Sequence, residues 1–324
     1  MMLHDAFARR LSYLRLSITD LCNFRCVYCL PDGYQGKCKN NELSLAEIAT
    51  LVQAFADCGT RKIRLTGGEP TLRSDVAEIV ALCAAQKGIE TVALTTNAHR
   101  LQDIFPKLRA AGLSKINISI DSFDDATFHR ITGKHHPERI VADIDRILGE
   151  GFHAVKVNTL LLRTTAWETL HDALDFVRRR PVTLRFIELM QTGDNHALFA
   201  SEHIRATELE TALTEQGWQL RPRDEHAGPA REYSHPDYTG GIGIIAPYAD
   251  SFCTTCNRLR VSAQGKLHLC LFAAEDADIR PFLTRGDAAG LSAFLREIVL
   301  RKPENHFLHQ KRSGLIRDLS MIGG

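Results

Sequence analysis

The first two-thirds of the chain alternate between short apolar runs and longer amphipathic stretches. Each short run is bounded by polar or turn-forming residues and is rich in β-branched side chains, which is typical of buried strands. This pattern predicts six strands, at residues 14–19, 62–66, 91–97, 115–121, 154–161 and 182–189.

Apolar residues recur at helical spacing between these strands, most clearly over residues 44–59. Ser44 and Glu47 form a capping-box pattern at the start of this stretch, and Gly59 supplies a stop. A second helix is predicted from Ser74 to Gly88, with Ser74 as its starting residue and Gly88 as its stop. Further helices are predicted at residues 137–149 and 166–180.

Six strand–helix alternations predict an α/β fold, in which helices cover the outside of a parallel sheet. Because the count is below eight, we predict an incomplete (β/α)6 TIM-type barrel, and an open doubly wound sheet is the alternative. In both architectures the reactive residues belong at the C-terminal ends of the strands and in the loops that follow them.

The alternation stops after about residue 221, at a stretch rich in proline, glycine and charged residues. We therefore predict a partial-barrel domain over residues 1–222 and a smaller α+β domain over residues 223–324 that caps the open side of the barrel. In the second domain we expect short strands and one helix, near residues 242–245, 259–262, 266–269 and 291–300.

The composition, with 44% hydrophobic and 24% charged residues, is that of a globular protein. A net charge of +1 gives no global field that favours nucleic acid or an anionic membrane, so an anionic ligand must be met by local Arg and Lys. We find neither a signal-peptide pattern nor an apolar span of about 20 residues. The expected location is the cytoplasm.

Six of the nine cysteines fall in two triplets. Since cytoplasmic thiols are kept reduced, we interpret the triplets as metal ligands rather than disulfides. Cys58 and Cys83 lie in predicted helices and are expected to be small core residues. Cys38 has no role that the sequence indicates.

The first triplet, Cys22, Cys26 and Cys29, directly follows the first predicted strand. Three thiolates can hold a four-iron cluster, but they leave one of its irons without a protein ligand. A structural zinc site would be closed by a fourth ligand. The loop therefore favours a cluster with one iron open for chemistry.

This Cys-x-x-x-Cys-x-x-Cys loop, with Tyr28 before its third cysteine, resembles the signature of the radical S-adenosylmethionine (SAM) superfamily. The resemblance implies that the open iron binds the methionine part of SAM, and that reduction cleaves SAM to methionine and a 5′-deoxyadenosyl radical. The sequence Gly-Gly-Glu-Pro at residues 67–70 resembles the glycine-rich turn of the superfamily, where a side chain would block close backbone approach.

The second triplet, Cys253, Cys256 and Cys270, is also one ligand short. It predicts a second four-iron cluster that binds substrate, and the alternative is a zinc site closed by His268. The two triplets resemble those of the GTP 3′,8-cyclase family, which catalyses the first step of molybdenum cofactor biosynthesis. The resemblance extends to RLTGGEPTLR, RFIELM, FCTTCNRLRVS and the terminal di-glycine.

The resemblance runs from about residue 5 to the last residue and implies a reaction. A hydrogen atom is taken from the ribose 3′ carbon of GTP, and the resulting carbon radical attacks carbon 8 of guanine. The aminyl-type radical so formed is then reduced by one electron and protonated, which gives (8S)-3′,8-cyclo-7,8-dihydroguanosine 5′-triphosphate. It also implies site residues. SAM would contact Tyr28, Gly68, Ser119 and Met190. GTP would contact Arg15, Arg64, Thr95 and Lys156 from the barrel, and Arg258, Leu259 and Arg260 from the second domain. The tail residues Gly323 and Gly324 would enter the active site.

The residues alone agree with an anionic ligand, because inward-facing cations are costly unless paired and a triphosphate pairs with several. The resemblance further implies an external one-electron reductant, a homodimer, and transfer of the product to a cyclic pyranopterin monophosphate synthase. Neither nucleic acid nor membrane is an expected partner. Two alternatives remain open: another radical SAM enzyme with an auxiliary cluster, acting on a peptide or other small molecule, and a non-enzymatic iron–sulfur or zinc protein that carries electrons or serves as a scaffold.

Overall fold

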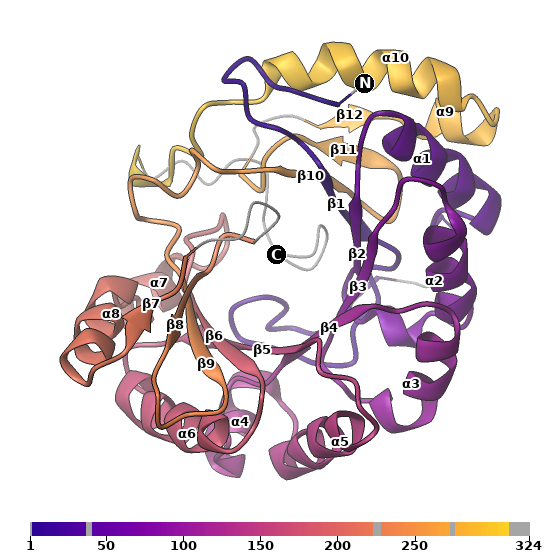
Figure 1. The fold of residues 1–324 in the computed structure, drawn as a ribbon. Coiled ribbons are helices and arrows are strands. Elements are labelled where there is room, and N and C mark those ends of the chain that lie inside the picture. The colour runs from indigo at the N-terminus through magenta and orange to yellow at the C-terminus, as the bar shows by residue number, and fades with distance from the viewer. Residues whose placement is uncertain (1, 37–40, 223–227, 273–275, 311–324) are drawn as a thin grey trace.

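The computed structural model describes residues 2–36, 41–222, 228–272 and 276–310. Its strands form one curved sheet with helices on the outside (Figure 1). The strands are β1 (Tyr13–Ser17), β2 (Lys62–Thr66), β3 (Thr91–Thr96), β4 (Lys115–Ser119), β5 (Val155–Leu161), β6 (Thr183–Glu188), β7 (Gln219–Leu220), β8 (Arg231–Ser234), β9 (Gly241–Ile245), β10 (Arg258–Val261), β11 (Lys266–His268) and β12 (Ala277–Asp278).

The six predicted strands are β1 to β6, which lie side by side in chain order and are all parallel. β10 pairs parallel with β1, and β9 pairs parallel with β6. At the two ends of the sheet, β12 and β7 do not pair with each other in the described part of the chain, so the sheet stays open. The predicted incomplete barrel is confirmed. Strands that follow residue 222 flank both edges of its opening, and the division into two domains there stays a prediction.

The helices are α1 (Leu45–Asp57), α2 (Val76–Ala85), α3 (Leu101–Ala110), α4 (Asp125–Thr132), α5 (Pro137–Gly149), α6 (Ala166–Arg178), α7 (His196–Glu202), α8 (Ala206–Glu215), α9 (Arg280–Thr284) and α10 (Ala288–Ile298). Short 3₁₀ helices span Pro70–Leu72, Val299–Arg301 and Leu308–Gln310. Within the described residues, no helix is both long enough and apolar enough to cross a lipid bilayer.

α1 forms as its sequence predicts. The Ser44 side chain accepts a hydrogen bond from the Glu47 amide at 3.3 Å, and the Glu47 carboxylate accepts one from the Ser44 amide at 2.9 Å. Gly59 ends the helical stretch with a left-handed φ of +84°. The capping box is therefore confirmed.

α2 differs from its prediction at its first turn. The helix begins at Val76 after Asp75 rather than at Ser74, and no side chain caps it. The Asp75 carboxylate accepts a hydrogen bond from Arg73 Nε at 2.7 Å instead. The ion pair with Arg73 thus occupies the Asp75 carboxylate, which could otherwise cap the helix. The sequence pattern of the cap does not indicate this ion pair.

Several short elements lack a clear pattern and went unpredicted, among them α3, α4, β8 and β12. α3 contains Pro106, which ordinarily argues against a helix. It forms because Leu101, Ile104, Phe105 and Leu108 bury one face against the core. Tertiary packing therefore outweighs local propensity there.

The main core lies between the sheet and its helices, and Leu51 of α1 is fully buried in it. We expect Leu51→Ala to cost about 2–5 kcal/mol, because the surrounding helices cannot close the cavity completely. The matched control is Leu300→Ala, since Leu300 is 56% exposed. Urea midpoints of the anaerobic holoprotein measure both. Equal midpoints for the two variants would contradict the described packing of α1.

Candidate active site

A single cavity of about 1020 Å³ occupies the inside of the barrel, and both cysteine triplets line it. The residues predicted to contact SAM and GTP also line it, with one exception. Leu259 is buried in the main core on the other face of β10. Gly323 and Gly324 lie outside the described residues, as does Cys38.

The first triplet sits in a loop that backbone hydrogen bonds hold in place. The amides of Arg25 and Val27 donate to the carbonyls of Thr132 and Ile131, at 3.0 and 2.9 Å, which ties the loop to the end of α4. Burial raises the pKa of Cys26 well above its usual range, and the charges of Asp121 and of the neighbouring thiols add to this. Three thiolates are stable together here only with a cation between them, which iron supplies.

Gly67 and Gly68 let the turn after β2 pack against this cysteine loop. A Cβ on Gly68 would lie 2.2 Å from the Leu21 carbonyl oxygen, and one on Gly67 would lie 2.2 Å from that of Thr19. Gly67 also has a left-handed φ of +148°. The two glycines are therefore required first by contact within the chain.

Glu69 joins the same turn to the end of β3. Its buried carboxylate accepts hydrogen bonds from Thr96 Oγ1 and the Asn97 amide, both at 2.7 Å, and from Thr71. Burial raises the pKa of Glu69, and these hydrogen bonds oppose the rise. The sequence motif places Glu69 in the turn but does not indicate these hydrogen bonds to the end of β3.

The second triplet has more cationic surroundings than the first. Arg258 Nη2 lies 3.9 Å from Cys256 Sγ, and the buried Lys302 donates to the carbonyls of Leu269 and Arg258. Burial alone would raise the pKa of Cys256, but the charges of Arg258 and Lys302 lower it to about 6. Arg9 Nη1 fixes the loop by donating to the Cys253 carbonyl at 3.0 Å.

The spacing of the cysteines argues against a single zinc ion at either triplet. Sulfur ligands on tetrahedral zinc lie about 3.8 Å apart, as the Zn–S bond length requires. Among the described residues, three metal-type ligand atoms all within 4.8 Å of one another occur only at Asp125, His136 and Glu138. Neither triplet is that compact, and His268 does not complete one. The donor set therefore fits a larger iron–sulfur cluster.

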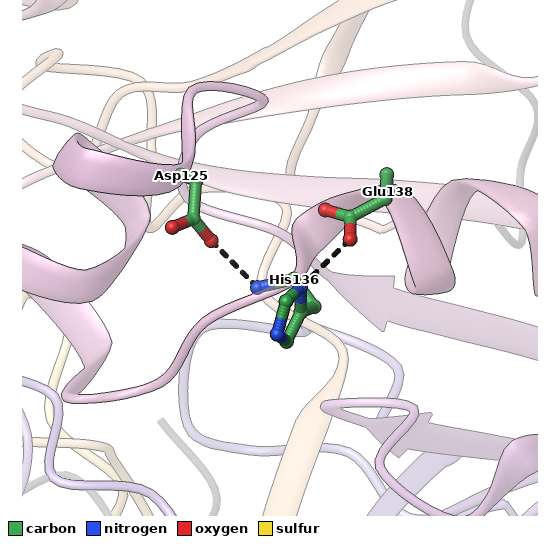
Figure 2. A group of neighbouring side chains, drawn as sticks. All are labelled: Asp125, His136 and Glu138. Carbon is green, nitrogen blue, oxygen red and sulfur yellow. Dashed lines mark hydrogen bonds and ion pairs between the residues drawn. The ribbon is translucent and has the colours of Figure 1, made fainter.

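The group of Asp125, His136 and Glu138 lies outside the cavity, between the starts of α4 and α5 (Figure 2). Asp125 accepts from the His136 amide at 2.6 Å, and the His136 ring pairs with Glu138 at 2.9 Å. All three side chains are exposed. These bonds order the start of α5, and we assign no metal to them.

Strand register places five of the ten cations that line the cavity in two rows. Arg260, Arg15 and Arg64 lie side by side on β10, β1 and β2. The second row lies two residues earlier along the same three strands, where Tyr13 of β1 lies between Arg258 of β10 and Lys62 of β2. Burial, together with repulsion from neighbouring arginines, lowers the pKa of Arg15 to about 9 and that of Arg260 to about 10.

Few negative charges balance these cations. The described residues that line the cavity include ten Lys and Arg side chains but three carboxylates. Each carboxylate already has partners: Glu69 in its turn, Asp121 with Tyr28 Oη at 2.9 Å, and Glu232 with Lys156. The Nε atoms of Arg185, Arg258 and Arg260 are buried without a hydrogen-bond partner in the described part of the chain. Such a site fits a polyanion.

Two further cations of the cavity wall were not predicted from the sequence. Lys62 and Arg185 line the cavity, and burial lowers the pKa of Lys62 to about 8 and that of Arg185 to about 10. Strand alternation was the available signal, because Lys62 lies two residues before Arg64 and therefore points to the same side of β2.

Met190 links the two triplets. It packs in a small apolar cluster with Tyr248, Leu271, Phe272 and Leu308, and both Cys29 and Cys270 pack against that cluster. The other predicted SAM contacts, Tyr28, Gly68 and Ser119, line the same cavity. The residues predicted to bind SAM and the cysteines of the second triplet therefore line the same cavity.

A cysteine loop at the C-terminal end of the first strand of an open parallel barrel defines a radical SAM enzyme. The radical SAM superfamily model matches residues 16–177, and the model for molybdenum cofactor synthesis C matches residues 182–308. The chain is 47% identical to a GTP 3′,8-cyclase of Cronobacter sakazakii, covering 99% of both chains. It is 45% identical to one of Vibrio vulnificus, covering 99% of this chain and 97% of the relative. The chain belongs to the GTP 3′,8-cyclase family.

A solved structure supports the fold independently. Streptococcus suis SuiB bound to S-adenosylmethionine aligns with a TM-score of 0.65 at 12% identity, covering 91% of this chain and 73% of that one. At such low identity the likeness concerns the fold alone.

We expect Gly68→Ala to displace the cysteine loop, because the added Cβ would overlap the Leu21 carbonyl. The reconstituted variant should lose about half of its iron, as one of two clusters would fail to assemble. Gly149→Ala is the control, since a Cβ there meets open space. Iron and sulfide analysis measures both proteins. Full iron content in the Gly68 variant would contradict the proposed role of the turn.

Proposed function

We propose that this protein converts GTP to (8S)-3′,8-cyclo-7,8-dihydroguanosine 5′-triphosphate, the first step of molybdenum cofactor biosynthesis. The observation that carries this proposal is one cavity that both cysteine triplets line, together with a surplus of buried cations. Membership of the GTP 3′,8-cyclase family supports the same reaction.

In this proposal Cys22, Cys26 and Cys29 hold the cluster that binds SAM, and Cys253, Cys256 and Cys270 hold the cluster that binds substrate. When bound, the first cluster and SAM supply a one-electron reductive cleavage that releases a 5′-deoxyadenosyl radical. Tyr28, Gly68, Ser119 and Met190 position SAM.

The remaining residues bind and orient the nucleotide. Arg15, Arg64, Thr95 and Lys156 hold it from the barrel, and Arg258 and Arg260 hold it from β10. Arg64 is already ordered for this task, since its Nη1 donates to the Leu94 carbonyl at 3.1 Å and to Thr95 Oγ1 at 3.2 Å. The barrel also keeps water away, which a reactive carbon radical requires.

Several further features belong to the proposal. We propose that residues 1–222 and 223–324 form two domains, that the enzyme is a homodimer in the cytoplasm, and that an external one-electron donor reduces it. We also propose that a cyclic pyranopterin monophosphate synthase consumes the product. A reducing compartment fits the cysteines, because cluster ligands must stay free thiols until iron binds.

Two cysteine variants test the function and separate the two clusters. Wild-type protein, reconstituted anaerobically and given dithionite, SAM and GTP, should yield 5′-deoxyadenosine and a cyclic isomer of GTP by mass spectrometry. Cys26→Ala should abolish both products, because SAM then lacks its iron. Cys256→Ala should keep some SAM cleavage and lose the cyclic product. The proposal fails if wild type makes no nucleotide product, and the cluster assignment fails if both variants cleave SAM like wild type.

The di-glycine tail gives a separate prediction from the sequence. Removing Gly323 and Gly324 should leave iron content and GTP binding intact, because no proposed ligand is lost. The rate of cyclic product formation should fall by about a hundredfold or more, since a displacement of ~1 Å at the reacting atoms has that effect. Turnover at the wild-type rate by the truncated protein would assign the tail no role.

A further inference from the structure

Tyr13 is the one aromatic side chain in the middle of the cation rows, and the proposed reaction gives it no task. It is 5% exposed and lines the cavity. Its Oη accepts a hydrogen bond from Arg64 Nε at 2.6 Å, and Lys62 Nζ lies 4.7 Å from the centre of its ring. Strand pairing puts Arg258 on its other side.

Within the described part of the chain, the phenol proton of Tyr13 has no hydrogen-bond acceptor. Tyr13 Oη donates no hydrogen bond to any of the described residues, although a buried tyrosine usually finds an acceptor. Among the described residues, the charged groups that face it are all cations: Arg15 on its own strand, Lys62 and Arg64 on β2, Arg258 and Arg260 on β10, and Arg185 on β6. The three cavity carboxylates are held elsewhere.

From this geometry we propose that Tyr13 is a positioning residue that serves as the internal counter-charge of the arginine cluster. As a phenolate it holds Arg64 and Lys62 in place while the cavity lacks nucleotide. When the phosphates of the nucleotide enter, Tyr13 takes up a proton from solvent and becomes a neutral phenol. The inference rests on the proposed nucleotide substrate and deepens it, because substrate binding then consumes a proton at a residue that does not react.

Electrostatics agrees with this assignment. Burial alone would raise the pKa of Tyr13, but the charges of Arg64, Arg15 and Lys62 lower it to about 7. A bound polyanion cancels those positive charges, so burial then dominates and the pKa rises again. Nucleotide binding that raises the pKa of Tyr13 takes up a proton. The affinity for the nucleotide therefore falls as the pH rises above the pKa of Tyr13 in the free enzyme.

Carbon-13 NMR of the anaerobic holoenzyme, labelled at the Cζ carbons of its six tyrosines, tests the proposal directly. One resonance should titrate with a midpoint near pH 7 in the free enzyme, and it should be absent from Tyr13→Phe. With GTP, or with inorganic triphosphate as a simpler polyanion, its midpoint should move up by at least about one pH unit.

A binding measurement adds a functional readout. Through Tyr13, the affinity of the wild type for GTP should fall about threefold to fivefold between pH 7 and pH 8, by linkage to a group with a pKa near 7 that binding raises by about one to two pH units. Tyr13→Phe should lack this component while retaining both clusters. The matched control is Tyr233→Phe, which removes a buried phenol outside the cavity whose pKa burial and Glu210 raise to about 12, and it should behave like wild type.

The outcomes distinguish this inference from the proposed function. A tyrosine resonance that moves with inorganic triphosphate but not with GTP supports the role of Tyr13 and contradicts the nucleotide substrate. If GTP binds and no tyrosine titrates between pH 6 and pH 8, the role of Tyr13 is overturned while the substrate stands. This second result needs wild-type protein alone, so it does not depend on how well the variant folds.

Discussion

The pairing of β10 with β1 is the contact on which the site depends. It joins segments more than 240 residues apart in the chain and puts Arg258 and Arg260 in register with Tyr13 and Arg15. The second cysteine triplet brackets β10, since two of its cysteines precede the strand and Cys270 follows β11. This one parallel pairing therefore brings the second triplet to the cavity that the first triplet already lines.

The pairing also gathers more positive charge than the described part of the chain neutralises. Three arginines in one row across adjacent strands repel one another, and burial removes the water that would screen them. Guanidinium groups that lack some of their hydrogen bonds inside a barrel lower the stability of the folded protein. Functional sites commonly carry such a cost. A polyanionic substrate relieves it, and Tyr13 offers a smaller relief while the cavity is free of substrate. Binding and folding are in this way linked through the same residues.

The local part of this architecture was predictable and the long-range part was not. The strands β1 to β6 and the helix α1 follow from hydrophobic spacing and capping, and the cysteine spacings with their flanking motifs identify the family. No local pattern indicates that β9 and β10 join opposite edges of the barrel strands, because register between distant segments is decided by packing. For the same reason the hydrogen bond between Arg64 and Tyr13, and the ion pair that moves the start of α2, appear only in three dimensions.

The central claim is that one cavity holds the ribose of GTP beside the SAM site while its phosphates meet the arginine rows. The most direct measurement uses GTP that carries deuterium at the ribose 3′ carbon, with reconstituted enzyme, dithionite and unlabelled SAM. Mass spectrometry of the 5′-deoxyadenosine should find one deuterium, because the ribose lies next to the site where SAM is cleaved. Unlabelled 5′-deoxyadenosine formed together with the cyclic product would contradict this arrangement of the cavity.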